Sequence, residues 1–128
     1  MSPDENRQII IDYWFEKSRE SLQAAKRDLE ANSPGFAMNR IYYSAFYAVS
    51  AVLMTKGLSF KKHSGVRSTF HLSIVKEGLI DPEWGKFYDR LFEDRQESDY
   101  VALVTFDSDY VQQQYERCEI LPSLLMNL

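Results

Sequence analysis

The sequence predicts an all-α fold, a helical bundle formed by one domain. Apolar residues recur at three- and four-residue intervals along several segments, whereas no segment keeps the two-residue alternation of a strand. The few prolines and glycines fall where such segments begin or end. No internal repeat, low-complexity tract or linker interrupts the 128 residues, so we expect a single domain over residues 1–128.

Two long helices are expected first, over residues 4–31 and 34–56. The first carries one apolar stripe and a charged outer face, as a helix on the surface of a bundle does. The second is apolar almost all round and therefore predicts the central, buried helix. The stripe of the first helix comprises Ile11, Trp14, Phe15, Leu22, Ala25 and Leu29.

Three further helices are predicted over residues 64–77, 82–100 and 107–121. Ser33-Pro34 and Asp81-Pro82 each place a capping residue before a proline at the first helical position. Gly57 and Gly78 lie where helices should end.

Charge and cysteine content exclude several classes of protein. A net charge of −4 argues against a protein that binds nucleic acid over its whole surface, so any such contact needs a local basic patch. Cys118 is the single cysteine, which excludes an internal disulfide. With only His63 and His71 besides it, we expect no metal site. The N-terminus lacks a signal peptide and the apolar run 41–54 is too short to span a membrane, so we expect a cytoplasmic protein without a membrane partner.

Arg95 is the residue that breaks the apolar pattern of its helix. It follows Leu91 by four residues and Tyr88 by seven, so it lies on the apolar stripe, where a guanidinium needs a carboxylate or a bound anion. Asp99, one turn further on, can pair with it. The pair is either a brace between helices or an arginine presented to an RNA phosphate or nucleotide, and spacing alone favours the brace.

Asn39 and Tyr43 share a face near the start of the second helix. Asn39 could join a hydrogen-bond network with Arg95, or it could remain exposed to water in the first turn. Both residues are candidate members of the same site.

A second candidate is a basic segment, residues 56–67, which contains almost no acid. Its candidate phosphate contacts are Lys61, Lys62, His63 and Arg67. A solvated basic loop, with His63 capping or framing the following helix, is the alternative.

Recognised catalytic motifs are missing. The sequence has no glycine-rich phosphate loop, no Gly-x-Ser-x-Gly, no His-Glu-x-x-His and no Cys-x-x-Cys. We therefore expect no cofactor and no independent hydrolase or transferase.

Four blocks, in this order, resemble the HEPN domain family and, more narrowly, its small prokaryotic UPF0332 branch. The resemblance spans about residues 10–121 and rests on Asn39-Arg-Ile-Tyr-Tyr-Ser-Ala-Phe-Tyr-Ala-Val, Leu53 with Lys56-Gly, His63-Ser-Gly-Val with Phe70, and Arg95-Gln-Glu-Ser-Asp-Tyr100. It implies an up-and-down bundle of four to five helices and a homodimer with a shared cleft. It also implies a minimal nucleotidyltransferase as partner in a toxin–antitoxin-like pair.

The resemblance also implies a metal-independent ribonuclease motif, Arg-x(4–6)-His, which this sequence lacks. After Arg95, the positions for histidine hold Tyr100, Val101 and Ala102. A tyrosine with an ordinary pKa near 10 is a poor general base at neutral pH. The sequence therefore favours a module that binds nucleotide or RNA phosphate near Arg95, Asp99 and Tyr100, with Tyr100 a candidate for modification by the partner. A ribonuclease toxin using Tyr100 or His63 and a purely structural dimeric partner protein are the alternatives.

Overall fold

The computed structural model describes residues 2–100 and 105–128, with the backbone alone described for residues 97–100. The described residues are helical and contain no strand, which confirms the predicted all-α class. The elements are α1 (Pro3–Glu30), α2 (Pro34–Thr55), α3 (His63–Phe70), a π-helical turn (His71–Val75), α4 (Pro82–Tyr100) and α5 (Ser108–Met126).

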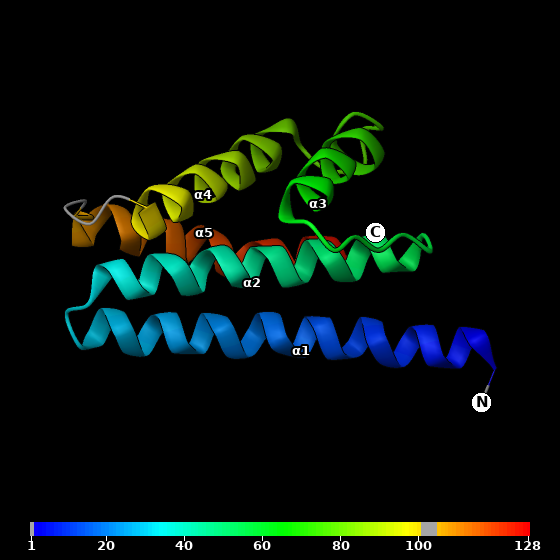
Figure 1. The fold of residues 1–128 in the computed structure, drawn as a ribbon, viewed down its shortest axis with the longest axis horizontal. Coiled ribbons are helices and arrows are strands. Elements are labelled where there is room, and N and C mark those ends of the chain that lie inside the picture. The colour runs from blue at the N-terminus through cyan, green and yellow to red at the C-terminus, as the bar shows by residue number, and fades with distance from the viewer. Residues whose placement is uncertain (1, 101–104) are drawn as a thin grey trace.

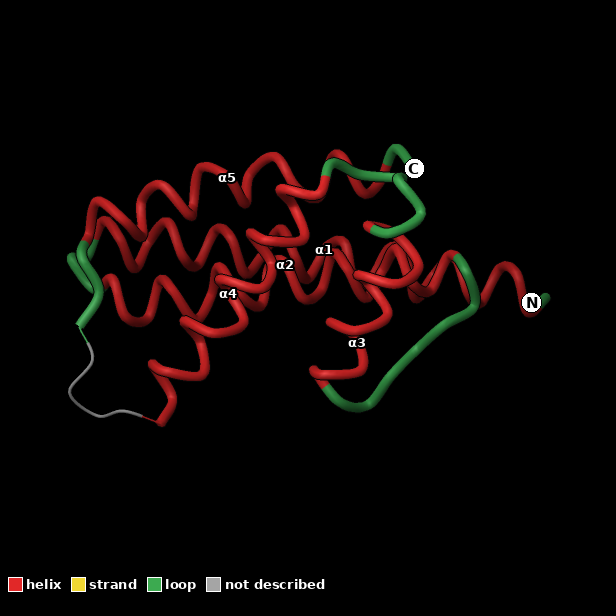
Figure 2. The backbone as a smooth tube through the Cα atoms, turned by 90° about the horizontal axis from the view of Figure 1, so that it is seen from above, coloured by secondary structure: helices red, strands yellow, loops and turns green. Residues whose placement is uncertain are grey.

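Helix α2 is the centre of the bundle, as its apolar sequence predicts. It lies against α1 along nearly its whole length, and α3 and α4 cover the side of α2 opposite α1 (Figure 1). Helix α5 packs beside α1 and α2, and both termini lie towards the same end of the bundle (Figure 2). Half of α2 is buried, in the set Ala37, Met38, Ile41, Tyr42, Ser44, Ala45, Ala48, Val49, Ala51, Val52 and Leu53.

Two fully buried serines join α1 to α2. The hydroxyl of Ser18 donates to the carbonyl of Ser44 at 2.7 Å, and the hydroxyl of Ser44 donates to the carbonyl of Ser18 at 2.9 Å. Small side chains at this crossing let the two backbones approach closely, and the reciprocal bonds satisfy hydroxyls that burial would otherwise penalise.

Helix boundaries follow the predicted signals at most positions. The Asp81 side chain accepts from the amide of Glu83 at 2.9 Å and so caps α4. Gly57 and Gly78 have positive φ angles of 76° and 75°. At each glycine the following amide reaches back five residues to a helix carbonyl, which is the geometry of a Schellman end.

Two predicted helices differ from the structure. The helix predicted over residues 64–77 is α3 followed by the π-helical turn at His71–Val75. The helix predicted to end at Leu121 continues through Pro122 to Met126. Burial of Leu125 explains the continuation, because the helix beyond Pro122 places this side chain in the core and so offsets the hydrogen bond that the proline removes.

Candidate functional site

Arg95 lies on α4 and faces the aromatic side chains of α2. Its guanidinium donates to the Tyr43 hydroxyl at 3.1 Å and lies 5.4 Å from the ring centres of both Tyr42 and Tyr43. The side chain is partly exposed. Cation–π contacts of this kind hold a guanidinium in one place without neutralising its charge.

His63, the first residue of α3, lies in the same aromatic cluster. Its Nδ1 is 2.7 Å from the Tyr42 hydroxyl, and its ring stacks on Phe46 with centres 4.2 Å apart. Burial, and next the positive charge of Arg95, lower the pKa of His63 below its ordinary value. The imidazole is therefore neutral at pH 7. It binds Tyr42 rather than capping α3, whose N-cap residue is Lys62.

Tyr42 connects the two basic side chains. It is fully buried, and burial raises the pKa of Tyr42 to about 12, so its hydroxyl stays protonated and serves as a hydrogen-bond partner rather than as a base. The cluster thus presents a fixed cation, Arg95, and a neutral imidazole, His63, which both contact the Tyr42 ring. A cation can bind a phosphate group, and an imidazole can accept or donate a proton. Enzymes that cleave phosphate esters use both kinds of group.

The model of the HEPN domain matches residues 11–127, which is nearly the whole chain. This chain belongs to the HEPN family. A "UPF0332 protein" of Thermotoga maritima is 46% identical over 113 residues, covering 88% of this chain and 86% of that protein.

Two similar proteins of Methanocaldococcus jannaschii carry toxin names. "Putative toxin MJ0142" is 38% identical over 73% of this chain and 64% of that protein. "Putative toxin MJ0605" is 38% identical over 72% of this chain and 69% of that protein.

The structure describes only some of the other residues that were predicted to lie around Arg95. The side chains of Asp99 and Tyr100 lie outside the described residues. Asn39 is half-buried on α2. The α2 hydroxyl that accepts the hydrogen bond from Arg95 belongs to Tyr43.

The four candidate phosphate contacts of this HEPN domain lie in three different surroundings. Lys61 and Lys62 are exposed in the loop before α3. His63 turns into the aromatic cluster. Arg67 pairs with Asp89 at 2.8 Å and lies over the ring of Phe92 at 4.5 Å.

Sequence reasoning missed a second polar group on α3, the π-helical turn and α4. His71 Nε2 and Arg67 Nε each lie 2.8 Å from the same Oδ1 of Asp89. Arg67 and His71 are four residues apart, and that spacing was the one available signal that they share a face. Buried Asp94, likewise missed, accepts a short hydrogen bond from the Tyr110 hydroxyl of α5.

The part of the chain that the structure describes was compared with the geometry of metal sites and of membrane-spanning helices. It contains no group of three or more His, Cys, Asp or Glu arranged to hold a metal ion. Nor does any described helix combine the length and apolar character needed to cross a bilayer.

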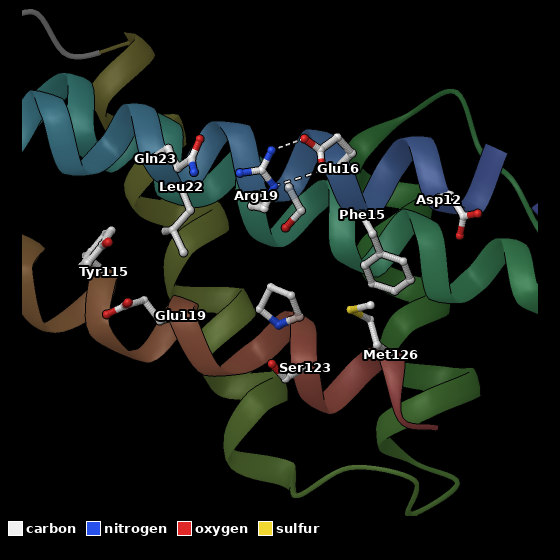
Figure 3. A pocket seen from close by; sticks show the side chains of 12 residues that line it. Asp12, Phe15, Glu16, Arg19, Leu22, Gln23, Tyr115, Glu119, Ser123 and Met126 are labelled. Atoms are coloured by element: carbon white, nitrogen blue, oxygen red, sulfur yellow. Dashed lines mark hydrogen bonds and ion pairs between the residues drawn. The ribbon is translucent and has the colours of Figure 1, made fainter. Parts of the chain in front are cut away.

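A hollow of about 520 Å³ lies between α1 and α5, and Arg95 is not among the residues that line it (Figure 3). Phe15 and Met126 form one end of it, and the Glu16–Arg19 ion pair lies along its α1 edge (Figure 3). Its further acidic residues, Asp12 and Glu119, make it a poor place for a phosphate.

Proposed function

We propose that this HEPN domain is a binding module that holds the phosphate of a nucleotide or of RNA at Arg95. The observation that carries the proposal is the placement of the Arg95 guanidinium, which is partly exposed and fixed by the Tyr43 hydroxyl and two aromatic rings. A guanidinium positioned in advance loses less entropy when it binds a phosphate. This arrangement favours the hypothesis that Arg95 binds a phosphate over the hypothesis that it only holds two helices together.

The same proposal includes a partner and a homodimer. Two similar proteins are named as toxins, which supports a role in a toxin–antitoxin-like pair. In that role the chain would form a homodimer and associate with a minimal nucleotidyltransferase. Its acidic net charge of −4 makes a protein partner more compatible with the surface as a whole than extended contact with nucleic acid.

Binding of a short 5′-labelled RNA, measured by fluorescence anisotropy at low and moderate salt, tests the phosphate site. We expect Arg95→Ala to weaken binding about tenfold or more and to reduce its salt dependence. Arg27→Ala, which removes an exposed arginine of α1, is the matched control and should leave binding unchanged. Equal affinities of wild type and Arg95→Ala would exclude Arg95 as the phosphate site.

Association with the partner needs a separate experiment. The chain is co-expressed with a minimal nucleotidyltransferase from the same genome, and the complex is measured by size-exclusion chromatography with light scattering. We expect a dimer of this chain bound to the partner. A monomer that does not co-elute with the nucleotidyltransferase would contradict this part of the proposal.

A metal-independent ribonuclease is the second candidate, because His63 lies beside Arg95 although it does not belong to the Arg-x(4–6)-His motif. In this reaction the ribose 2′-oxygen attacks the phosphorus while the bond to the 5′-oxygen breaks, the departing 5′-oxygen takes a proton from water, and a 2′,3′-cyclic phosphate forms. His63 Nε2 would accept the 2′ proton, which requires the tautomer in which Nδ1–H donates to the Tyr42 oxygen.

Incubation of total RNA with the protein and a chelator tests that candidate. Cleavage that disappears in both His63→Gln and Arg95→Ala would support it. RNA that stays intact with wild-type protein would exclude it, while the binding measurement above would still report on the phosphate site.

A further inference from the structure

A second hollow, of about 280 Å³, opens beside His63 under the loop that precedes α3. We propose that this hollow binds the base of the nucleotide whose phosphate lies at Arg95. The inference rests on the proposed phosphate site and extends it, since it assigns the chemical part of the ligand that Arg95 does not contact.

The lining of the hollow suits a flat aromatic ring. Three aromatic side chains contribute to it, namely Trp14 from α1, Phe46 from α2 and Phe60 from the loop. Stacking on aromatic side chains is the usual way in which proteins hold an unpaired base. The hydroxyls of Ser50 and Ser59 add hydrogen-bonding groups at the edge. The volume lies just below the range of pockets that hold drug-sized molecules, which fits a single ring system.

Two ring contacts connect the hollow to Arg95. His63 forms part of its wall, and the His63 ring centre is 5.8 Å from that of Tyr42. The Arg95 guanidinium lies 5.4 Å from the same Tyr42 ring. The positive charge of Arg95 also helps to lower the pKa of His63, which agrees with this proximity. A base in the hollow and a phosphate at Arg95 would therefore both lie close to the Tyr42–His63 pair.

Charge distinguishes a nucleotide from other flat ligands. Lys61 lines the hollow itself, and the segment 56–67 carries basic side chains and no aspartate or glutamate. A protein partner could insert an aromatic side chain into the hollow, but an uncharged side chain would not interact with the positive charge of Lys61. An anionic ligand with an aromatic ring uses both features, and a nucleotide is such a ligand.

Isothermal titration of the full chain with matched small ligands tests the proposal. The ligands are AMP, GMP, CMP and UMP, compared with ribose 5-phosphate, which has the phosphate but no base, and with adenosine, which has the base but no phosphate. We expect at least one nucleotide to bind roughly 5- to 100-fold more tightly than ribose 5-phosphate, as stacking of one base implies.

Two variants localise the base. Phe60→Ala removes an exposed ring of the hollow, and Ser59→Trp fills the hollow from an exposed loop position. Both should bring the affinity for that nucleotide close to that for ribose 5-phosphate. Phe36→Ala is the matched control, because Phe36 is 70% exposed and does not line the hollow.

The outcomes separate this inference from the phosphate site. If all four nucleotides bind no better than ribose 5-phosphate while Arg95→Ala weakens them all, the base site is overturned and the phosphate site stands. If Arg95→Ala changes nothing but Phe60→Ala abolishes nucleotide and adenosine binding, the hollow binds the base and the phosphate site is overturned. Nucleotide affinity insensitive to both Phe60→Ala and Ser59→Trp would also overturn the base site.

Discussion

The Tyr42 hydroxyl and His63 Nδ1 lie 2.7 Å apart, although the two residues are 21 positions apart in the chain. This bond fastens the start of α3 to the central helix and fixes the imidazole beside Arg95. The relationship has measurable consequences for the ionisation of His63, for the dependence of folding on pH and for the proposed chemistry.

His63 should titrate below the ordinary histidine value of about 6.5. Burial is the main cause, and the charge of Arg95 adds to it, so Arg95→Ala should raise the pKa of His63 towards the ordinary value without restoring it fully. NMR titration of the imidazole carbon-bound protons measures both changes. Arg27→Ala serves as the control for loss of one positive charge elsewhere. A His63 pKa above 6.5 in wild type would contradict the arrangement.

Folding stability should fall as the pH is lowered from about 6.5 towards the folded-state pKa of His63. Because the pKa of His63 is lowered in the folded state, the unfolded chain binds more protons within this window, and stability therefore rises with pH. Urea unfolding at pH 7.5, 6.5 and 5.5 measures the effect. The His63→Gln variant should lose less stability across this range than wild type, and equal losses would count against the prediction.

The sequence predicted the helices and the unusual position of Arg95 because both depend on local periodicity. Caps at Asp81 and Gly57 are also local, and the structure has helix ends at both. Continuation of α5 through Pro122 was not predictable in this way. It depends on burial of Leu125 against other helices, which the proline signal does not include.

The composition of the site was only partly predictable for the same reason. Tyr43 was a candidate for the site because it shares a helix face with Asn39, and in the structure its hydroxyl accepts a hydrogen bond from Arg95. The approach of His63 depends on how the loop after Gly57 returns to α2, and no periodic pattern encodes that path. Arg67 was predicted as a phosphate contact, but its partner Asp89 comes from another helix 22 residues away.

The reciprocal bonds between Ser18 and Ser44 should be coupled energetically. Ser18→Ala and Ser44→Ala should each reduce the free energy of unfolding by about 1 kcal/mol, because each removes a buried hydrogen bond. The double variant should lose less than the two single variants together, since the hydroxyls also lie 3.2 Å from each other. Urea unfolding provides all four values. Ser68→Ala, at an exposed serine that also bonds a helix carbonyl, is the control and should change stability by about 0.5 kcal/mol or less.

Gly85 is buried inside α4 because the His71 ring occupies the space beside it. A Cβ at this position would lie 2.9 Å from His71 Cε1 and 3.3 Å from a Val75 methyl carbon. Gly85→Ala should therefore lower the free energy of unfolding by about 1 to 3 kcal/mol through overpacking, although alanine normally favours a helix interior over glycine by about 1 kcal/mol.

Removal of the His71 ring should abolish this loss of stability or reverse its sign. In a His71→Ala background, Gly85→Ala should be neutral or stabilising, because the remaining close neighbour is the Val75 methyl carbon. Gly35→Ala is the matched control, since a Cβ there meets nothing within 4 Å and should not destabilise the protein. Thermal and urea unfolding of the single and double variants measure the coupling. An equal loss from Gly85→Ala with and without the His71 ring would mean that His71 does not determine the need for glycine.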